Sequence, residues 1–109
     1  MSEEELLKPG EREMIQSRSY LYDLLNKLND ILENKKEILE QKGIAPKLSV
    51  TLELITLNRL YLNVIYKTYW NQLLEVINEL NAIPELKDDM VDVNADVEEI
   101  KKLKQEGGF

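Results

Sequence analysis

The sequence predicts an all-α fold, in which a long antiparallel helical hairpin is followed by a shorter C-terminal helix. Apolar residues recur three and four positions apart along most of the chain, and glycine and proline are few. The clearest turn signal, Gly43-Ile44-Ala45-Pro46, divides this pattern in two. Two such hairpins are expected to pair into a four-helix-bundle-like dimer.

Residues 1–10 are predicted to form a flexible lead-in. Ser2 and Glu5 fit a capping box, but Pro9-Gly10 stops any helix that begins there. The hairpin is then predicted over residues 11–83.

The first helix of the hairpin is predicted over residues 11–42. Its apolar stripe has helical spacing and comprises Met14, Leu21, Leu24, Leu25, Leu28, Ile31, Leu32, Ile38 and Leu39. Lys35 interrupts the stripe within a polar run, where we expect looser packing. Gly43 can adopt a left-handed conformation after the helix, and Ile44 can then contact Leu39 as in a Schellman motif.

The second helix is predicted over residues 47–82, before Pro84. Its seam keeps a 4-3 spacing and comprises Leu48, Leu52, Ile55, Leu62, Tyr66, Tyr69, Leu73, Val76 and Leu80. Only Arg59 interrupts it. Residues 48–57 also alternate and contain β-branched side chains, so a strand is the alternative there. The seam continues into an unambiguous helical pattern, which favours the helix.

At 1.5 Å per residue, these helices would be about 48 and 54 Å long, so the hairpin is expected to be a rod. Its short turn predicts a register in which Leu28 meets Leu62. In the same register, Arg59 is expected to form an ion pair with Asp30 or Glu33.

The C-terminal acidic helix is predicted over residues 84–106, with residues 107–109 as a flexible tail. Its apolar face is Leu86, Met90, Val93, Val97 and Ile100. We expect this helix to fold back beside residues 66–77. Phe109, the only phenylalanine, could insert into a partner's pocket, although an unstructured end is the alternative.

One hairpin partner cannot cover every apolar side of the second helix. The side chains that point elsewhere are Val50, Leu54, Leu57, Leu60, Tyr61 and Val64. A large exposed apolar patch usually marks an interface. We therefore expect these residues to contact a second copy of the chain, or another helical protein.

Two other groups of side chains are candidate sites. An aromatic cluster is expected at one level of the hairpin, from Tyr20, Tyr22, Tyr66, Tyr69 and Trp70. It is either a hot spot for a partner or part of the core. An acidic face is expected on the C-terminal helix, from Asp88, Asp89, Asp92, Asp96 and Glu99. It either docks on a basic surface or faces solvent.

The composition argues against several classes of function. There is no cysteine or histidine, and no cofactor or metal is expected. Asp92, Asn94 and Asp96 open like a calcium loop, but Val97 and Leu103 replace its glycine and glutamate. A net charge of −7 without a basic stripe argues against direct nucleic-acid binding. Charges interrupt every apolar run, so no membrane span is expected, and a cytoplasmic location follows.

The sequence therefore predicts a non-enzymatic helical protein for protein–protein interaction or assembly, acting as a dimer or as a subunit of a larger complex. The alternative is an acidic accessory or inhibitor protein that binds the basic surface of a nucleic-acid-processing machine. An enzyme would need a pocket with converging carboxylates, and no small-molecule substrate is expected.

Overall fold

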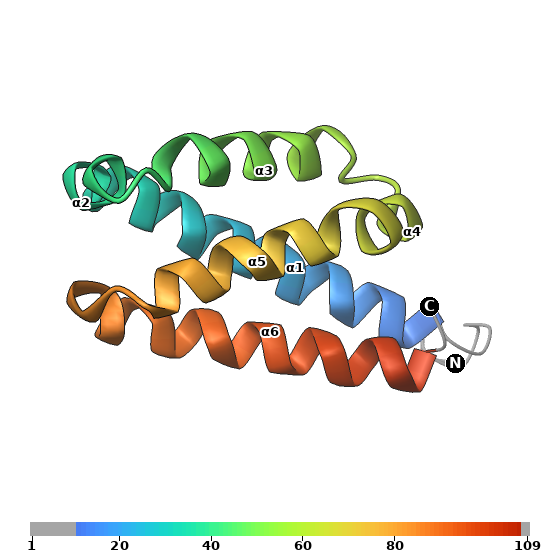
Figure 1. Cartoon of the computed structure of the whole chain (residues 1–109). Helices are drawn as coiled ribbons and strands as arrows, with labels where there is room; N and C mark the ends of the chain where they lie inside the picture. Colours follow the sequence, from blue (N-terminus) through green and yellow to red (C-terminus); the bar gives the residue numbers. More distant parts are fainter. Residues whose placement is uncertain (1–10, 108–109) are drawn as a thin grey trace.

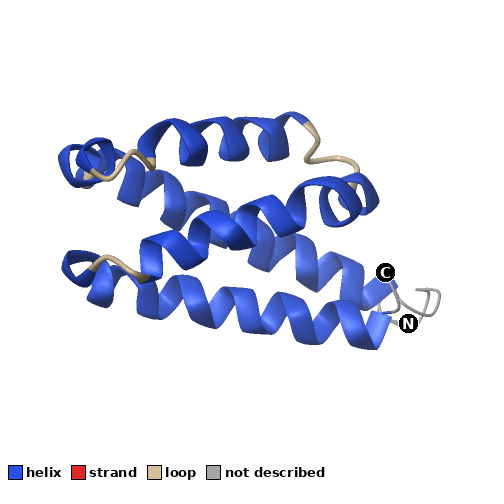
Figure 2. Cartoon of the chain, viewed as in Figure 1, coloured by secondary structure: helices blue, strands red, loops and turns tan. Residues whose placement is uncertain are grey.

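The computed structural model describes residues 11–107, and every regular element in this range is helical (Figure 2). The all-α prediction is therefore confirmed, and residues 48–57 are helix rather than strand. The predicted lead-in over residues 1–10, and Phe109, lie outside the described residues. The elements in chain order are α1 (Glu11–Asn34), α2 (Lys36–Gln41), α3 (Ala45–Leu57), α4 (Leu62–Val64), the π-helix η2 (Ile65–Tyr69), α5 (Trp70–Asn81), the 3₁₀ turn η3 (Pro84–Leu86) and α6 (Lys87–Gly107).

The first predicted helix is interrupted in the middle of its polar run. Lys35 leaves helical geometry, with φ −118° and ψ 28°, and separates α1 from α2. The Lys35 amide donates to the Ile31 carbonyl, and the Leu39 amide donates to the Lys35 carbonyl, so each helix keeps one hydrogen bond to this residue. The sequence predicts looser packing here, and the structure has a break in helical geometry between α1 and α2.

The turn between α2 and α3 is the predicted Schellman motif. Gly43 has φ +70°, the left-handed conformation that glycine adopts without a steric penalty. The Ile44 amide donates to the Leu39 carbonyl at 2.9 Å, and the Gly43 amide to the Glu40 carbonyl at 3.1 Å. Ile44 and Leu39 are both buried in the core. Pro46 lies in the first turn of α3, where it costs no hydrogen bond.

The second predicted helix is not continuous, and this is the main correction to the predicted hairpin. Residues 58–61 leave helical geometry between α3 and α4. The chain then turns back, so that α5 runs antiparallel to α3 (Figure 1). Gln72 Nε2 bonds Thr51 Oγ1 at 3.0 Å and Lys47 Nζ bonds Glu79 Oε1 at 3.1 Å, which fixes their register.

The C-terminal helix takes the place that the hairpin prediction gave to the second helix. α6 lies antiparallel to α1 and packs against it more extensively than any other pair of elements does (Figure 1). It also runs beside α5, as predicted, where Asn81 and Asn94 exchange two amide hydrogen bonds of 3.0 and 2.9 Å. The break at 58–61 makes this arrangement possible, because it returns α5 and α6 to the side of α1.

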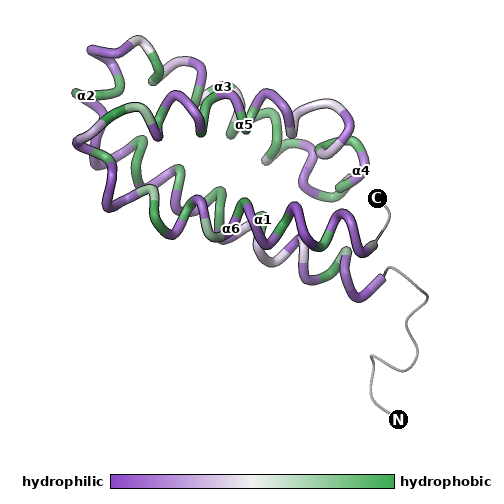
Figure 3. Tube along the Cα trace, turned by 60° about the horizontal axis from the view of Figure 1, so that its bottom comes forward, coloured by the Kyte–Doolittle hydropathy of each residue, from purple (hydrophilic) through white to green (hydrophobic). Residues whose placement is uncertain are grey.

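The result is an elongated bundle with extents of 52 × 25 × 20 Å. Apolar and polar residues alternate along its helices (Figure 3). One core runs through the whole bundle, and it includes every predicted apolar position of the C-terminal helix and all of the 4-3 seam except Tyr69, which is half-buried. The predicted pairing of Arg59 with Asp30 or Glu33 is wrong. Arg59 is exposed, and among residues 11–107 it forms no salt bridge.

Candidate interaction surface

Large apolar side chains are exposed along α3, the break and α4. We call them the apolar surface, and its members are Val50 (51% exposed), Leu57 (70%), Leu60 (68%), Tyr61 (63%) and Val64 (41%). All five belong to the predicted contact residues. The sixth, Leu54, is half-buried. Their role in binding a partner stays a prediction.

The composition of α3 explains why its apolar side chains cannot all be buried. Leu48, Leu52 and Ile55 fill the core, but the helix carries apolar residues around most of its circumference. A helix of this kind is usually covered on more than one side. In the single chain, Val50 and Leu57 lie on the side that no other helix covers.

The break beside these residues is held by polar side chains. Asn58 Nδ2 donates to the Leu54 carbonyl at 2.8 Å, and Arg59 Nη1 donates to the Thr56 carbonyl at 3.1 Å. Both carbonyls, at the C-terminus of α3, also accept backbone amides, those of Asn58 at 3.2 Å and Arg59 at 3.3 Å, so each side chain adds a second hydrogen bond. The interruption of the seam at Arg59 was the one sequence signal for this break.

The predicted aromatic cluster forms only in part. The Tyr66 and Trp70 rings meet edge to face, 5.5 Å apart, and both side chains are buried. Tyr20 and Tyr22 line separate grooves, one between α1 and α6 and the other between α1 and the end of α3. The two tyrosines therefore do not share one surface, and a single aromatic hot spot is not assembled.

Tyr66 also belongs to a small polar group that was not predicted from the sequence. The Tyr66 and Ser17 hydroxyls are hydrogen-bonded, and Lys104 Nζ lies 4.9 Å from the centre of the Tyr66 ring. Burial raises the pKa of Tyr66 and lowers the pKa of Lys104. Ser17 occupies an apolar-stripe position between Met14 and Leu21, which is the signal that could have found it.

The predicted acidic face is divided by the structure. Asp88, Asp89, Asp92 and Glu99 are exposed, but Asp96 is only 7% exposed and points toward α1. Asp96 therefore does not present its charge to solvent, because its carboxylate is bound to Lys27.

The Lys27–Asp96 pair fixes α1 against α6. Lys27 Nζ lies 2.6 Å from Asp96 Oδ2. The hydrogen bond to Asp96 raises the pKa of Lys27, with smaller contributions from the charges of Asp96, Asp92 and Asp23. Asn94 is likewise bound to Asn81, so two residues of the calcium-like pattern already have protein partners.

An acidic groove lies where α1 ends and α6 begins. Asp88, Asp89 and Asp92 meet Asp30 there, and Asp30 was not part of the predicted face. Lys27 and Lys35 border the same groove and oppose its charge. No observation therefore favours the acidic accessory or inhibitor function, which stays a prediction.

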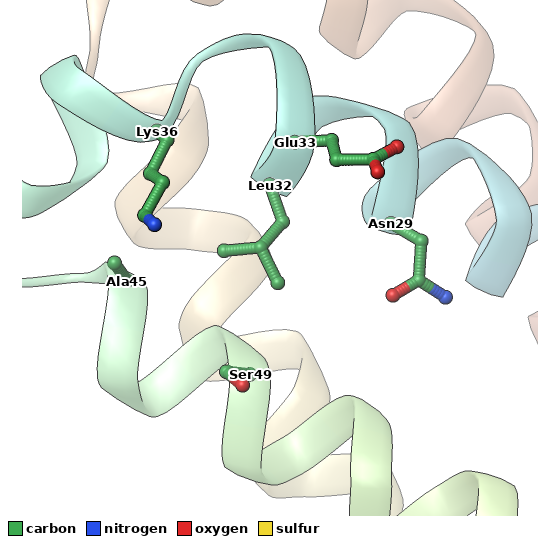
Figure 4. A pocket seen from close by; sticks show the side chains of 6 residues that line it. All are labelled: Asn29, Leu32, Glu33, Lys36, Ala45 and Ser49. Atoms are coloured by element: carbon green, nitrogen blue, oxygen red, sulfur yellow. The ribbon is translucent and has the colours of Figure 1, made fainter.

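A groove of about 520 Å³ runs between α1 and α3 (Figure 4). Leu32 extends from α1 toward Ala45 and Ser49 on α3, whereas the Glu33 carboxylate points away from α3. Lys36 and Asn29 complete its lining. Its only carboxylate is that of Glu33, so the converging acids expected of an enzyme are not brought together in this groove.

Comparison with protein families, curated proteins and solved structures gives no match. Within residues 11–107, no helix has the length and apolar character needed to cross a membrane.

Proposed function

We propose that the chain is a non-enzymatic helical interaction protein, which assembles with a second copy of itself or with another helical protein through the apolar surface. The exposure of Leu57, Leu60 and Tyr61 carries this proposal, since each leaves more than 60% of its surface in solvent. The proposal places this assembly in the cytoplasm, in keeping with the composition.

The size of the apolar surface supports an interface. Its five side chains, which are 41–70% exposed, offer about 500 Å² per chain. Contact between two such surfaces would bury about 1,000 Å², which is the lower bound for a specific interface. At about 25 cal/mol per Å², this contact contributes about 25 kcal/mol of gross stabilisation before association costs are subtracted.

The proposal is tested by placing charge on the apolar surface. The double variant Leu57→Lys/Leu60→Lys should fold as the wild type does, because both side chains are already exposed, but it should lose self-association. Val91→Lys is the matched control, because Val91 is 64% exposed on α6 and lies outside the apolar surface. Sedimentation velocity should show the wild type and Val91→Lys associating alike. Equal association of the double variant would refute this surface as the contact.

A further inference from the structure

The break between α3 and α4 preserves the phase of the apolar seam. Ile55 before the break and Leu62 after it are both buried, and they lie one heptad apart. A turn built into the sequence has no need to keep this spacing. Residues 55–62 therefore have the pattern of a continuous helix, although residues 58–61 are not helical in the single chain.

The break also lacks the two residues that end helices most strongly. Its sequence is Asn58-Arg59-Leu60-Tyr61, without glycine or proline. The other two connections between long helices do contain them, Gly43 and Pro46 in one and Pro84 in the other. Nothing in the covalent chemistry of residues 58–61 therefore prevents them from becoming helical.

A helix that continued through the break would gather the exposed residues into a second seam. Val50, Leu54, Leu57, Tyr61 and Val64 follow a 4-3-4-3 spacing, with Leu60 beside them. Leu57 is the midpoint of this seam. A helix with apolar residues on two faces is usually covered by more than one partner.

We propose that the partner is a second copy of this chain, and that the two copies exchange their C-terminal halves. Residues 58–61 become helical, so α3, α4 and α5 join into one helix of about 37 residues and about 55 Å. The α5–α6 pair of each copy then packs on α1 and α3 of the other. This inference rests on the proposed function, because it makes a second copy the partner and places the meeting of the two copies at the end of the apolar surface, residues 60–64.

Exchange keeps the contacts of the core. The Lys47–Glu79, Gln72–Thr51 and Lys27–Asp96 contacts all join elements on opposite sides of the break. In the exchanged dimer, the same contacts form between the two chains. The exchanged state additionally gains the helical hydrogen bonds of residues 58–61. Because the Lys47–Glu79 and Gln72–Thr51 contacts are kept, the two long helices cross near residue 62, which places Leu60 of one copy level with Val64 of the other.

These pairs provide a direct test. Unlabelled and heavy-nitrogen-labelled chains are unfolded together, refolded at high concentration, and treated with a carbodiimide, which joins a lysine amine to a neighbouring carboxylate. Mass spectrometry of the dimer fraction should find Lys47–Glu79 and Lys27–Asp96 cross-links that combine one labelled and one unlabelled peptide. The Lys36–Glu40 pair, at 3.9 Å within one helix, is the internal control and should never be mixed.

Each other outcome of this experiment overturns the exchange. A dimer whose Lys47–Glu79 and Lys27–Asp96 cross-links are never mixed would show closed chains docked through the apolar surface, so the proposed function would stand without exchange. A chain that stays monomeric at every concentration would overturn both exchange and self-assembly, and would leave another helical protein as the proposed partner of the apolar surface.

Paired variants at the break test the straightening of the helix itself. Arg59→Ala/Leu60→Ala and Arg59→Gly/Leu60→Gly remove almost the same side-chain atoms, but alanine favours a helix by about fivefold per position. Each chain carries two such positions, so an exchanged dimer carries four. The dissociation constant of the dimer should therefore be about 100- to 1,000-fold lower for the alanine variant than for the glycine variant. Equal dissociation constants would exclude a continuous helix through the break.

Discussion

Gly43 shows how a single residue determines the direction of the chain. Its φ of +70° is strained for any residue with a Cβ atom, although a Cβ atom there would meet no neighbour within 4 Å. Gly43→Ala should therefore lower the free energy of unfolding by about 1–2 kcal/mol through backbone strain alone. Gly43→Asn should lose less, because asparagine tolerates the left-handed region better. Urea denaturation of both variants checks this order, and equal stability of Gly43→Ala and the wild type would contradict it.

Lys27 gives the stability of the protein a dependence on alkaline pH. Its pKa is raised in the folded chain above the ordinary value of 10.5, chiefly by the hydrogen bond to Asp96. A raised pKa stabilises the fold fully at pH values below the unfolded pKa, and this stabilisation is lost as pH rises through the folded pKa. The stability difference between the wild type and Lys27→Met should therefore be constant up to about pH 10 and shrink above it.

Denaturation curves at several pH values measure this difference directly. Lys36→Met is the control, since it removes the same charge from a lysine whose side chain is 70% exposed. Alkaline effects common to all variants, including the ionisation of Tyr66, cancel in the comparison. A difference between the wild type and Lys27→Met that persists unchanged well above pH 11 would argue against the Lys27–Asp96 contribution.

At the scale of elements, α3 has one buried face and one exposed face. Ile55 is fully buried and Leu57, two residues away, is 70% exposed. Ile55→Ala should cost about 2–5 kcal/mol of unfolding free energy, because it leaves a cavity in the core. Leu57→Ala should change the unfolding free energy of the monomer by less than about 0.5 kcal/mol. If Ile55→Ala and Leu57→Ala lost similar amounts of unfolding free energy in dilute protein, Leu57 would have to be covered within the chain.

Most elements could be predicted from the sequence because local chemistry determines them. Gly43 and Pro46 define one turn, Pro84 ends α5, and the 4-3 spacing from Leu86 to Ile100 defines the buried face of α6. The break at 58–61 could not be predicted in this way, because its residues are compatible with a helix. The break accompanies the packing of α6 against α1 within one chain, and that contact joins distant parts of the sequence.

The candidate site was predictable to a similar extent. The exposed residues of the apolar surface could be predicted because α3 is apolar around its circumference. Asp96 was assigned to the acidic face by its spacing, but spacing alone does not reveal that Lys27 from a distant helix binds it. The same limit explains why the Ser17–Tyr66 hydrogen bond was missed.

For the whole molecule, one chain forms a complete core and still leaves the end of α3 uncovered. The break allows α5 and α6 to return to α1, but it exposes Leu57, Leu60 and Tyr61. A second copy can cover this surface either by docking or by exchange. In the proposed assembly, the mass of the particle in solution depends on these exposed side chains.

The most direct test is the molar mass of the purified chain by sedimentation equilibrium across the micromolar range. Covering of the apolar surface by a second copy predicts a mass that approaches twice the chain mass of 12.8 kDa as the concentration rises. A mass that stays at 12.8 kDa throughout this range would contradict self-association through residues 50–64.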